Sequence, residues 1–376
     1  MNIDQETAKR LLANGAIMLL MDFPVDLSFG IDLNEWQTGP RFKGLKLIPP
    51  GFHFIHYRSV IYVGQWNTSD EDITTESDLD PDHVARLKYN ILEFEANLGA
   101  YPLIPHPQQP VPTFQKWLRL TNFINEQLVN KLLPNSKKVS SLVSSSRFSE
   151  LDGTIQGINI KNNNNRFSER ETTDSTAVQN IIEIKFSVID LKHSFPENSA
   201  PEQRTKYWLD KSYLLKNLLK YTWKGDYKAL LGELQFSFVL FLVGQVYDGL
   251  EQWKSIVKLL CTSKEALADT SLVSSLFFDF ISCLYAQLEE CPDDFFVDAL
   301  SSSNFLREAI VDLVCNIRDP DTCDRVPNPQ LEQKLSLFVN FVSERFKWDL
   351  EKAVHEKWAF DENEEGEFAP VIAEEI

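Results

Sequence analysis

The sequence predicts an α+β protein in which a β-rich N-terminal domain precedes an all-α, helical-array C-terminal domain. Three observations lead to this fold class. Short apolar runs broken by proline and glycine occur early in residues 1–133, a Ser- and Asn-rich segment fills residues 134–180, and apolar residues recur at helical spacing from about Lys206 to Trp348. With 376 residues, 43% of them hydrophobic, the chain is long enough for two domains with their own cores.

The N-terminal domain begins with two predicted strands, "AIMLLMDFP" (16–24) and "LSFGIDL" (27–33), because turn residues bound each short apolar run. A helix is predicted over residues 80–99, with Asp80 as its cap and Gly99 as its stop. Its apolar face comprises Val84, Leu87, Ile91, Phe94 and Leu98. Residues 113–134 predict a second helix on the spacing of Trp117, Leu120, Phe123 and Ile124.

The segment 134–180 is predicted to be a flexible linker, because it is rich in Ser, Asn and Thr and poor in residues that fill a core. The next run, "IIEIKFSVIDL" (181–191), alternates apolar and polar residues and predicts a strand at the start of the C-terminal domain, residues 181–348.

The C-terminal domain is predicted to be mainly helical. Residues 226–261 indicate an antiparallel helix pair that turns near Gly244, and three further stretches, 271–290, 292–317 and 328–348, supply at least one helix each. The apolar run Leu234–Tyr247 is too short for a bilayer, which needs about 20 residues, and is expected to be a buried helix.

Composition argues against several classes of protein. The formal net charge of -18 disfavours binding to nucleic acid, which uses clustered Lys and Arg. The five cysteines, Cys261, Cys283, Cys291, Cys315 and Cys323, never form a Cys-x-x-Cys pair, so buried free thiols are expected rather than a zinc or redox site. The absence of a secretory signal at Met1 predicts the cytoplasm and nucleus.

The stretch "GPRFKGLKLIPPGFHFIHY" (39–57) is not a phosphate loop. Gly39 and Gly44 have the required spacing, but Leu45 replaces the lysine and Lys46 replaces the hydroxyl residue. His53 and His56 are three residues apart on a predicted strand and point to opposite faces, so structural histidines are favoured over metal ligands.

The patterns G-x-S-x-G, H-E-x-x-H and G-x-G-x-x-G do not occur in the sequence, and an enzyme with a carboxylate pair that forms only on folding is the third-ranked reading. We therefore expect a protein that is not an enzyme, with no catalytic residues, cofactor, metal ion or small-molecule substrate.

The C-terminal residues 349–376 are predicted to form an acidic tail. From Asp361 to Ile376 there are seven acids and no base, yet the segment includes Phe368, Val371 and Ile372. Such a segment can add a strand to another protein's sheet, and plain disorder is an equal alternative.

Six sequence blocks, in order, resemble the Aar-two (AAR2) family of splicing factors, first named for cistron splicing. They are "FGIDLNEWQTGPRFKGLKLIPPGFHFIHY" (29–57), "WLRLTNFI" (117–124), "EIKFSVIDLKHSFP" (183–196), "LDKSYLL" (209–215), "LGELQFSFVLFLVGQVYDGLEQWKSIVKLLC" (231–261) and "FFVDAL" (295–300). This chain departs from the family after "HYRSV", where only "IYVGQW" (61–66) stands in place of a longer segment.

The resemblance implies an assembly chaperone of the U-five (U5) small nuclear ribonucleoprotein, or snRNP. Such proteins bind the large scaffold protein of that particle through its RNase-H-like and endonuclease-like domains, delay the loading of an RNA helicase, and leave before the tri-snRNP forms. No direct contact with nucleic acid or membrane is implied. A generic helical adaptor unrelated to splicing is the alternative.

The resemblance also implies two sets of site residues. The tail strand matches Ala369, Pro370, Val371 and Ile372, with Phe368 preceding them. Release by phosphorylation points to Thr262 or Ser263, although Ser263 can equally be the cap of a helix in "SKEALAD".

Overall fold

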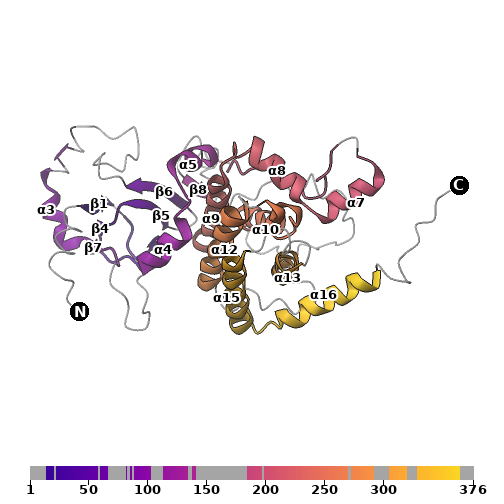
Figure 1. The fold of residues 1–376 in the computed structure, drawn as a ribbon. Coiled ribbons are helices and arrows are strands. Elements are labelled where there is room, and N and C mark those ends of the chain that lie inside the picture. Colours follow the sequence, from indigo (N-terminus) through magenta and orange to yellow (C-terminus); the bar gives the residue numbers. More distant parts are fainter. Residues whose placement is uncertain are drawn as a thin grey trace, which may run out of the picture. The chain divides into compact units, whose positions relative to one another are not determined.

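The computed structural model describes residues 14–20, 23–57, 60–66, 82, 85–86, 89–102, 113–133, 138–140, 184–196, 199–269, 272–291, 305–319 and 328–364. Strands come first along the chain and helices dominate afterwards, which confirms the predicted α+β class (Figure 1). The chain divides into two compact units: Met1–Phe186 with Val239–Gly249, and Ser187–Phe238 with Leu250–Ile376.

The first unit contains two sheets with strand orders β1-β4-β7 and β3-β2-β5-β6-β8. Both strands predicted near the N-terminus are present, one in each sheet. All strand pairs are antiparallel except β4 with β7. The strands are β1 (Ala16–Leu19), β2 (Ser28–Ile31), β3 (Asn34–Gln37), β4 (Gly44–Ile48), β5 (Gly51–Tyr57), β6 (Val60–Trp66), β7 (Gly99–Ala100) and β8 (Lys138–Ser140).

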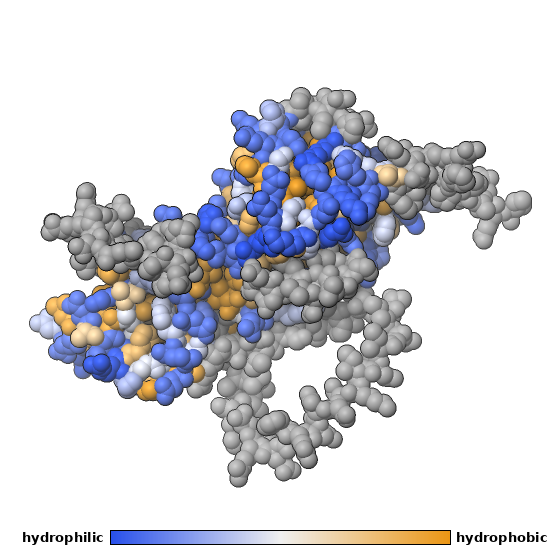
Figure 2. Space-filling model, turned by 90° about the horizontal axis from the view of Figure 1, so that it is seen from below, coloured by the Kyte–Doolittle hydropathy of each residue, from blue (hydrophilic) through white to orange (hydrophobic). Residues whose placement is uncertain are grey.

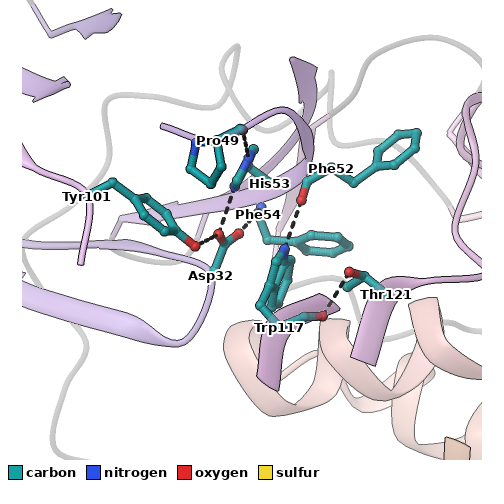
Figure 3. A network of polar contacts seen from close by, with 8 residues as sticks. All are labelled: Asp32, Pro49, Phe52, His53, Phe54, Tyr101, Trp117 and Thr121. Carbon is teal, nitrogen blue, oxygen red and sulfur yellow. Dashed lines mark hydrogen bonds and ion pairs between the residues drawn. The ribbon is translucent and has the colours of Figure 1, made fainter. Parts of the chain in front are cut away.

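Apolar side chains from both sheets form the core of this unit. Its buried members are Ala16, Phe29, Ile31, Leu45, Ile48, Ile55 and Tyr101. Helix α4 (Thr113–Thr121) adds Trp117, whose ring lies 5.5 Å from that of Phe54 and whose indole nitrogen donates to the carbonyl of Phe52 at 2.8 Å (Figure 3). A buried tryptophan needs such a partner for its N–H group.

The helix predicted over residues 80–99 ends earlier than expected. Helix α3 (Ile91–Phe94) passes into the 3₁₀ turn η1 (Glu95–Asn97), and Leu98 is already extended at φ −91° and ψ 125°. Gly99 starts β7 and pairs with Leu45. Pairing with a distant strand therefore overrides the local helical pattern. Asp80, the predicted cap, lies outside the described residues.

The single helix predicted over residues 113–134 is in fact two helices. Helix α4 ends at Thr121, and α5 (Glu126–Leu132) begins after Asn125. The Asn125 side chain accepts a hydrogen bond from the Leu128 N–H at 2.9 Å and caps α5. Asparagine before an acidic first turn was therefore a start signal inside an otherwise continuous apolar pattern.

Two predictions for the connecting region are wrong where the structure describes it. Lys138–Ser140, inside the predicted linker 134–180, forms β8 and pairs with β6. Residues 184–190, inside the predicted strand 181–191, have no strand partner. Their polar backbone groups bind elsewhere: the Lys185 N–H donates to the Leu132 carbonyl at 2.9 Å, and Ser187 binds side chains of later helices.

Helices and the short connections between them make up the described chain from Pro201 to Glu364, as predicted for the C-terminal domain. A turn at Gln245, with φ 53°, separates α9 from α10 next to the predicted position, Gly244. The helices are α7 (Pro201–Leu209), α8 (Ser212–Tyr221), α9 (Tyr227–Gly244), α10 (Tyr247–Cys261), η3 (Glu265–Ala268), the π-helical η4 (Val273–Phe277), α12 (Phe278–Glu290), α13 (Phe305–Arg318), α15 (Pro329–Phe346) and α16 (Leu350–Glu364).

The acidic tail predicted for residues 349–376 is wrong in its first part, because Leu350–Glu364 forms α16. Leu350, Ala353 and Val354 are buried at the i, i+3, i+4 spacing of one helical face. Lys357 pairs with Asp312 of α13, so the helix is held by both packing and charge. Residues 365–376 lie outside the described chain.

Helix α9 is the longest apolar element described, at 18 residues, and by length and composition alone it could cross a bilayer. The buried helix predicted over Leu234–Tyr247 in fact begins at Tyr227 and ends at Gly244. Within the protein 61% of α9 is buried, and Glu233, Gln235 and Ser237 are buried with hydrogen-bond partners. This is the pattern of a core helix.

The tight approach of β1 to β4 leads to a test with a built-in control. Gly44 has φ +130°, and a Cβ there would lie 1.9 Å from the Met18 carbonyl oxygen, whereas a Cβ at Gly39 would meet nothing within 4 Å. We expect Gly44→Ala to lower the free energy of unfolding by about 3 kcal/mol and Gly39→Ala to change it by less than about 0.5 kcal/mol. Urea unfolding would measure both, and equal effects would show that the strand approach is not tight.

Candidate functional site

Three polar clusters in the described chain involve side chains of the kinds used in catalysis or regulation. The first surrounds the carboxylate of Asp32, in the β2–β3 turn at φ 57° (Figure 3). The Asp32 carboxylate accepts hydrogen bonds from the Nδ1–H of His53 at 2.7 Å, from the hydroxyl of Tyr101 at 2.6 Å and from the Phe54 N–H at 3.0 Å. The Asp32 N–H in turn donates to the Phe54 carbonyl at 2.7 Å.

The hydrogen bonds of His53 in this cluster favour its positively charged form. Its Nε2–H donates to the Pro49 carbonyl at 2.7 Å, because a carbonyl can only accept, and an ionised Asp32 carboxylate requires a proton on Nδ1 as well. Burial lowers the pKa of His53, but the charge of Asp32 and the hydrogen bonds to Asp32 and Pro49 outweigh it, and the pKa lies above its usual value. Burial, with the nearby Asp32 charge, also raises the pKa of Tyr101, which therefore remains a donor.

This geometry supports a structural role for His53, as the sequence predicted. An Asp–His pair acts as a general base only when the second ring nitrogen faces a nucleophile or solvent. Here the second nitrogen, Nε2, is hydrogen-bonded to the Pro49 carbonyl, and His53 is only 3% exposed. His56 projects from β5 over Gly30, where a Cβ would lie 2.1 Å from the imidazole ring. The two histidines do not converge, and no group of three or more His, Cys, Asp or Glu in the described residues could hold a metal ion.

The second cluster surrounds Glu233 on α9, which is fully buried. Its carboxylate accepts from the Ser187 N–H at 2.6 Å, the Ser187 hydroxyl at 2.7 Å, the Trp223 indole at 3.1 Å and the Gln252 amide at 3.0 Å. Gln252 also donates to the Ser187 carbonyl at 3.0 Å. The carboxylate thus anchors a segment that has no strand partner. The sequence analysis did not predict that Glu233 binds Ser187, although a single acidic residue within an apolar helix indicates a buried carboxylate with specific partners.

The third cluster joins the "LDKS" motif to the end of α10, where the predicted regulatory residues lie. Asp210 accepts from the Glu265 N–H at 2.8 Å, the Ser212 hydroxyl accepts from the Ala266 N–H at 2.8 Å, and the Lys211 N–H donates to the Thr262 carbonyl at 3.0 Å. We call Asp210, Lys211 and Ser212 the LDKS clamp. Two segments about 50 residues apart are thereby fixed to each other.

The structure contradicts the reading of Ser263 as a helix cap. The η3 turn has Lys264 at its cap position without a side-chain bond, and the LDKS clamp satisfies the first N–H groups instead. The Ser263 hydroxyl is 1% exposed and donates to the Leu259 carbonyl at 2.7 Å, while Thr262 is partly buried and donates to the Lys258 carbonyl at 2.7 Å.

The remaining predicted residues divide into two groups. The tail residues Phe368 to Ile372 lie outside the described chain, as does Cys323. The other cysteines are buried free thiols, as predicted: Cys261, Cys283, Cys291 and Cys315. Burial raises the pKa of Cys283 and Cys291 to about 12, so these thiols are poor nucleophiles at neutral pH.

On the face drawn in Figure 2, hydrophobic residues lie in groups among hydrophilic ones.

Comparison with known proteins gives matches in both halves of the chain. A family model described as the AAR2 C-terminal repeat region matches residues 186–351, and one described as the AAR2 N-terminal domain matches residues 14–61 and 58–134. The chain is 32% identical over 384 residues to Protein AAR2 homolog of Homo sapiens, covering 92% of this chain and 93% of the relative.

Two further relatives extend the comparison to distant organisms. Identity to Protein AAR2 homolog of Caenorhabditis elegans is 31% over 373 residues, covering 92% of this chain and 97% of the relative. Identity to A1 cistron-splicing factor AAR2 of Saccharomyces cerevisiae is 22% over 292 residues, covering 72% and 76%. The similarity therefore runs through both the strand-rich and the helical parts.

The charged state of His53 predicts a pH dependence of stability. Because its folded pKa is raised, its contribution is complete below the unfolded value of about 6.5 and is lost as pH rises through the folded pKa. We expect His53→Gln to lower the free energy of unfolding by about 3 kcal/mol at pH 6 and by less at pH 9. Urea unfolding from pH 6 to pH 9 would measure the difference in free energy of unfolding between the variant and wild type, with a substitution of the exposed His193, His193→Gln, as control. If that difference did not become smaller as pH rises, His53 would not be an imidazolium in the folded protein.

Proposed function

This chain belongs to the AAR2 family, as its sequence blocks predicted, and from that premise we propose that it is a splicing factor that assists assembly of the U5 snRNP. The observation that supports this most directly is the similarity over the whole chain, because the S. cerevisiae relative is named a cistron-splicing factor. The same similarity argues against a generic helical adaptor, which would share helices but not the strand-rich domain.

The proposed activity is binding and not catalysis. The buried polar clusters around Asp32 and Glu233 are filled by hydrogen bonds from the chain itself. A catalytic group has to reach a substrate, and neither carboxylate does so in the described structure. The relatives named above carry no enzyme name.

The proposed partner is the large scaffold protein of the U5 snRNP, through its RNase-H-like and endonuclease-like domains. In this role the protein occupies the scaffold in both cytoplasm and nucleus and delays helicase loading. A net charge of -18 suits a basic, RNA-handling partner, because complementary charge speeds encounter and disfavours wrong partners.

The tail segment from Phe368 to Ile372 is the proposed strand that adds to a sheet of the scaffold. It has no charged residue between Glu367 and Glu374, and it contains β-branched Val371 and Ile372. Main-chain hydrogen bonds to an open sheet edge would provide the affinity, and alternating side chains would set the register.

Phosphorylation at Thr262 or Ser263 is the proposed release signal. Either hydroxyl now donates to a carbonyl of α10, and the Thr262 carbonyl accepts from the LDKS clamp. A phosphate removes the donated hydrogen bond and adds nearly two negative charges. At Ser263, which is 1% exposed, modification requires local opening and would hold the α10 end away from the clamp.

Loss of the tail tests the partner. We expect the full chain to bind the joined RNase-H-like and endonuclease-like fragment of the scaffold, and a version ending at Glu364 to bind at least tenfold more weakly, a loss of about 1.4 kcal/mol. Titration calorimetry measures both. A control with Glu374→Gln and Glu375→Gln separates tail charge from the strand residues. Absence of binding by the full chain would refute the proposed partner.

A charge at Ser263 tests the release signal. We expect Ser263→Asp to weaken scaffold binding tenfold or more by opening the LDKS clamp, and Ser263→Ala to have a smaller effect. The matched control is Ser282→Asp on α12, because Ser282 makes the same type of bond, to the Phe278 carbonyl, but is exposed. Equal binding by Ser263→Asp and wild type, in the same calorimetric assay, would exclude this site.

A further inference from the structure

Among the α-helices of seven or more residues in the described chain, α7 is the one that buries none of its described side chains. Its nine residues, Pro201–Leu209, are exposed or partly exposed throughout, apart from Glu202, whose side chain is not described. Surface helices normally bury an apolar stripe, and an isolated helix of this length is unstable in water. A helix of this kind is a candidate for contact with a further segment.

Contacts at the ends of α7 hold it in place. The Ser194 hydroxyl donates to the Tyr207 carbonyl at 2.6 Å, and the Arg204 Nε–H donates to the Ser199 carbonyl at 2.9 Å. Lys206 pairs with Glu265 at 2.6 Å. These contacts fix the position of α7 without covering its apolar residues.

The uncovered residues of α7 are large and apolar. Trp208 is 60% exposed and Leu209 is 65% exposed. The ammonium of Lys211 lies 5.6 Å from the Trp208 ring centroid, within cation–π range, and keeps positive charge beside the indole. We call Arg204, Lys206, Trp208 and Leu209 the α7 face.

The part of the sequence that contains the α7 face is basic in an acidic protein, although Lys206 of the face already pairs with Glu265. Residues 199–228 contain seven Lys or Arg and three Asp or Glu, while the whole chain has a formal charge of -18. Of these, Lys216 and Lys220 are exposed one turn apart on α8. An occupant of this face should therefore combine negative charge with apolar side chains.

One segment of the same chain has that composition. From Asp361 to Ile376 there are seven acids, no base, and the apolar residues Phe368, Val371 and Ile372. We propose that the α7 face binds the chain's own segment 365–376 when the protein is free. The contact goes beyond the proposed function: a tail held on α7 must leave it before it can add a strand to a partner.

The path from α16 to α7 is short enough for this contact. Ion pairs link Lys206 of α7 to Glu265, Lys264 to Asp319, and Arg318 to Glu351 of α16. These pairs place α7 and the start of α16 near the same end of α13, and the end of α16 lies about 20 Å from its start. Helix α16 ends at Glu364, and the twelve residues that follow can span about 40 Å when extended.

Contact quenching of a label by Trp208 tests the proposal in the full chain. The described native thiols are buried, so with Cys323→Ser a bimane dye can be attached selectively at Ala373→Cys. Tryptophan quenches this dye only at contact distance. We expect Trp208→Phe to raise its fluorescence at least twofold, and Lys206→Glu or 1 M salt to do the same by weakening charge attraction.

The matched control is Trp358→Phe, because Trp358 lies on α16, close in sequence to the label. Relief of quenching by Trp208→Phe but not by Trp358→Phe supports the contact. Equal fluorescence with and without Trp208, or relief only by Trp358→Phe, overturns it. Binding of oligouridine that needs Trp208, with quenching unchanged, would instead assign the face to nucleic acid. No scaffold protein enters these measurements, so their outcome is independent of the proposed partner.

Discussion

The buried carboxylate of Asp32 organises the N-terminal sheets. A charge removed from water must be matched by a partner and by hydrogen bonds, and His53, Tyr101 and the Phe54 amide together provide them. Asp32 and its partners come from three places along the chain, so the β2–β3 turn, β5 and the segment after β7 are fixed with respect to one another. The long stretch from Gly39 to Tyr57 is therefore scaffold, and its histidines are part of the fold.

In the helical unit, hydrogen bonds from polar side chains likewise connect segments that have no strand partner or helix cap of their own. Glu233 satisfies both the backbone and the hydroxyl of Ser187, and the LDKS clamp satisfies the first amides of η3. Two of the sequence blocks that resemble the family therefore contain the partners of one hydrogen-bond network, Ser187 and Glu233. A third block, "LDKSYLL", contains the LDKS clamp, which binds η3 and the end of α10. Residues that look like recognition motifs in the sequence are in large part connections between helices.

Local patterns in the sequence were enough for the fold class, most helices, the structural histidines and the buried thiols. They failed where a distant partner decides the local structure. Gly99 joins a strand because it pairs with Leu45, Ser187 binds the Glu233 side chain and not a neighbouring strand, and the helix that begins at Leu350 packs on α13. The site residues of the tail came only from resemblance, since no periodicity singles them out.

The composition of α9 also has a consequence for how the chain is made. Several of its buried polar groups have partners later in the sequence: Glu233 binds Gln252 in addition to Ser187 and Trp223, Gln235 contacts Cys283, and the Leu234 carbonyl accepts from Gln287. Ribosomes add roughly 5–20 residues per second, so about 40 residues separate the end of α9 from its last partner by about 2–9 s. During that interval the later helices that cover α9 are not yet made, so its apolar residues lack the contacts that bury them in the folded protein.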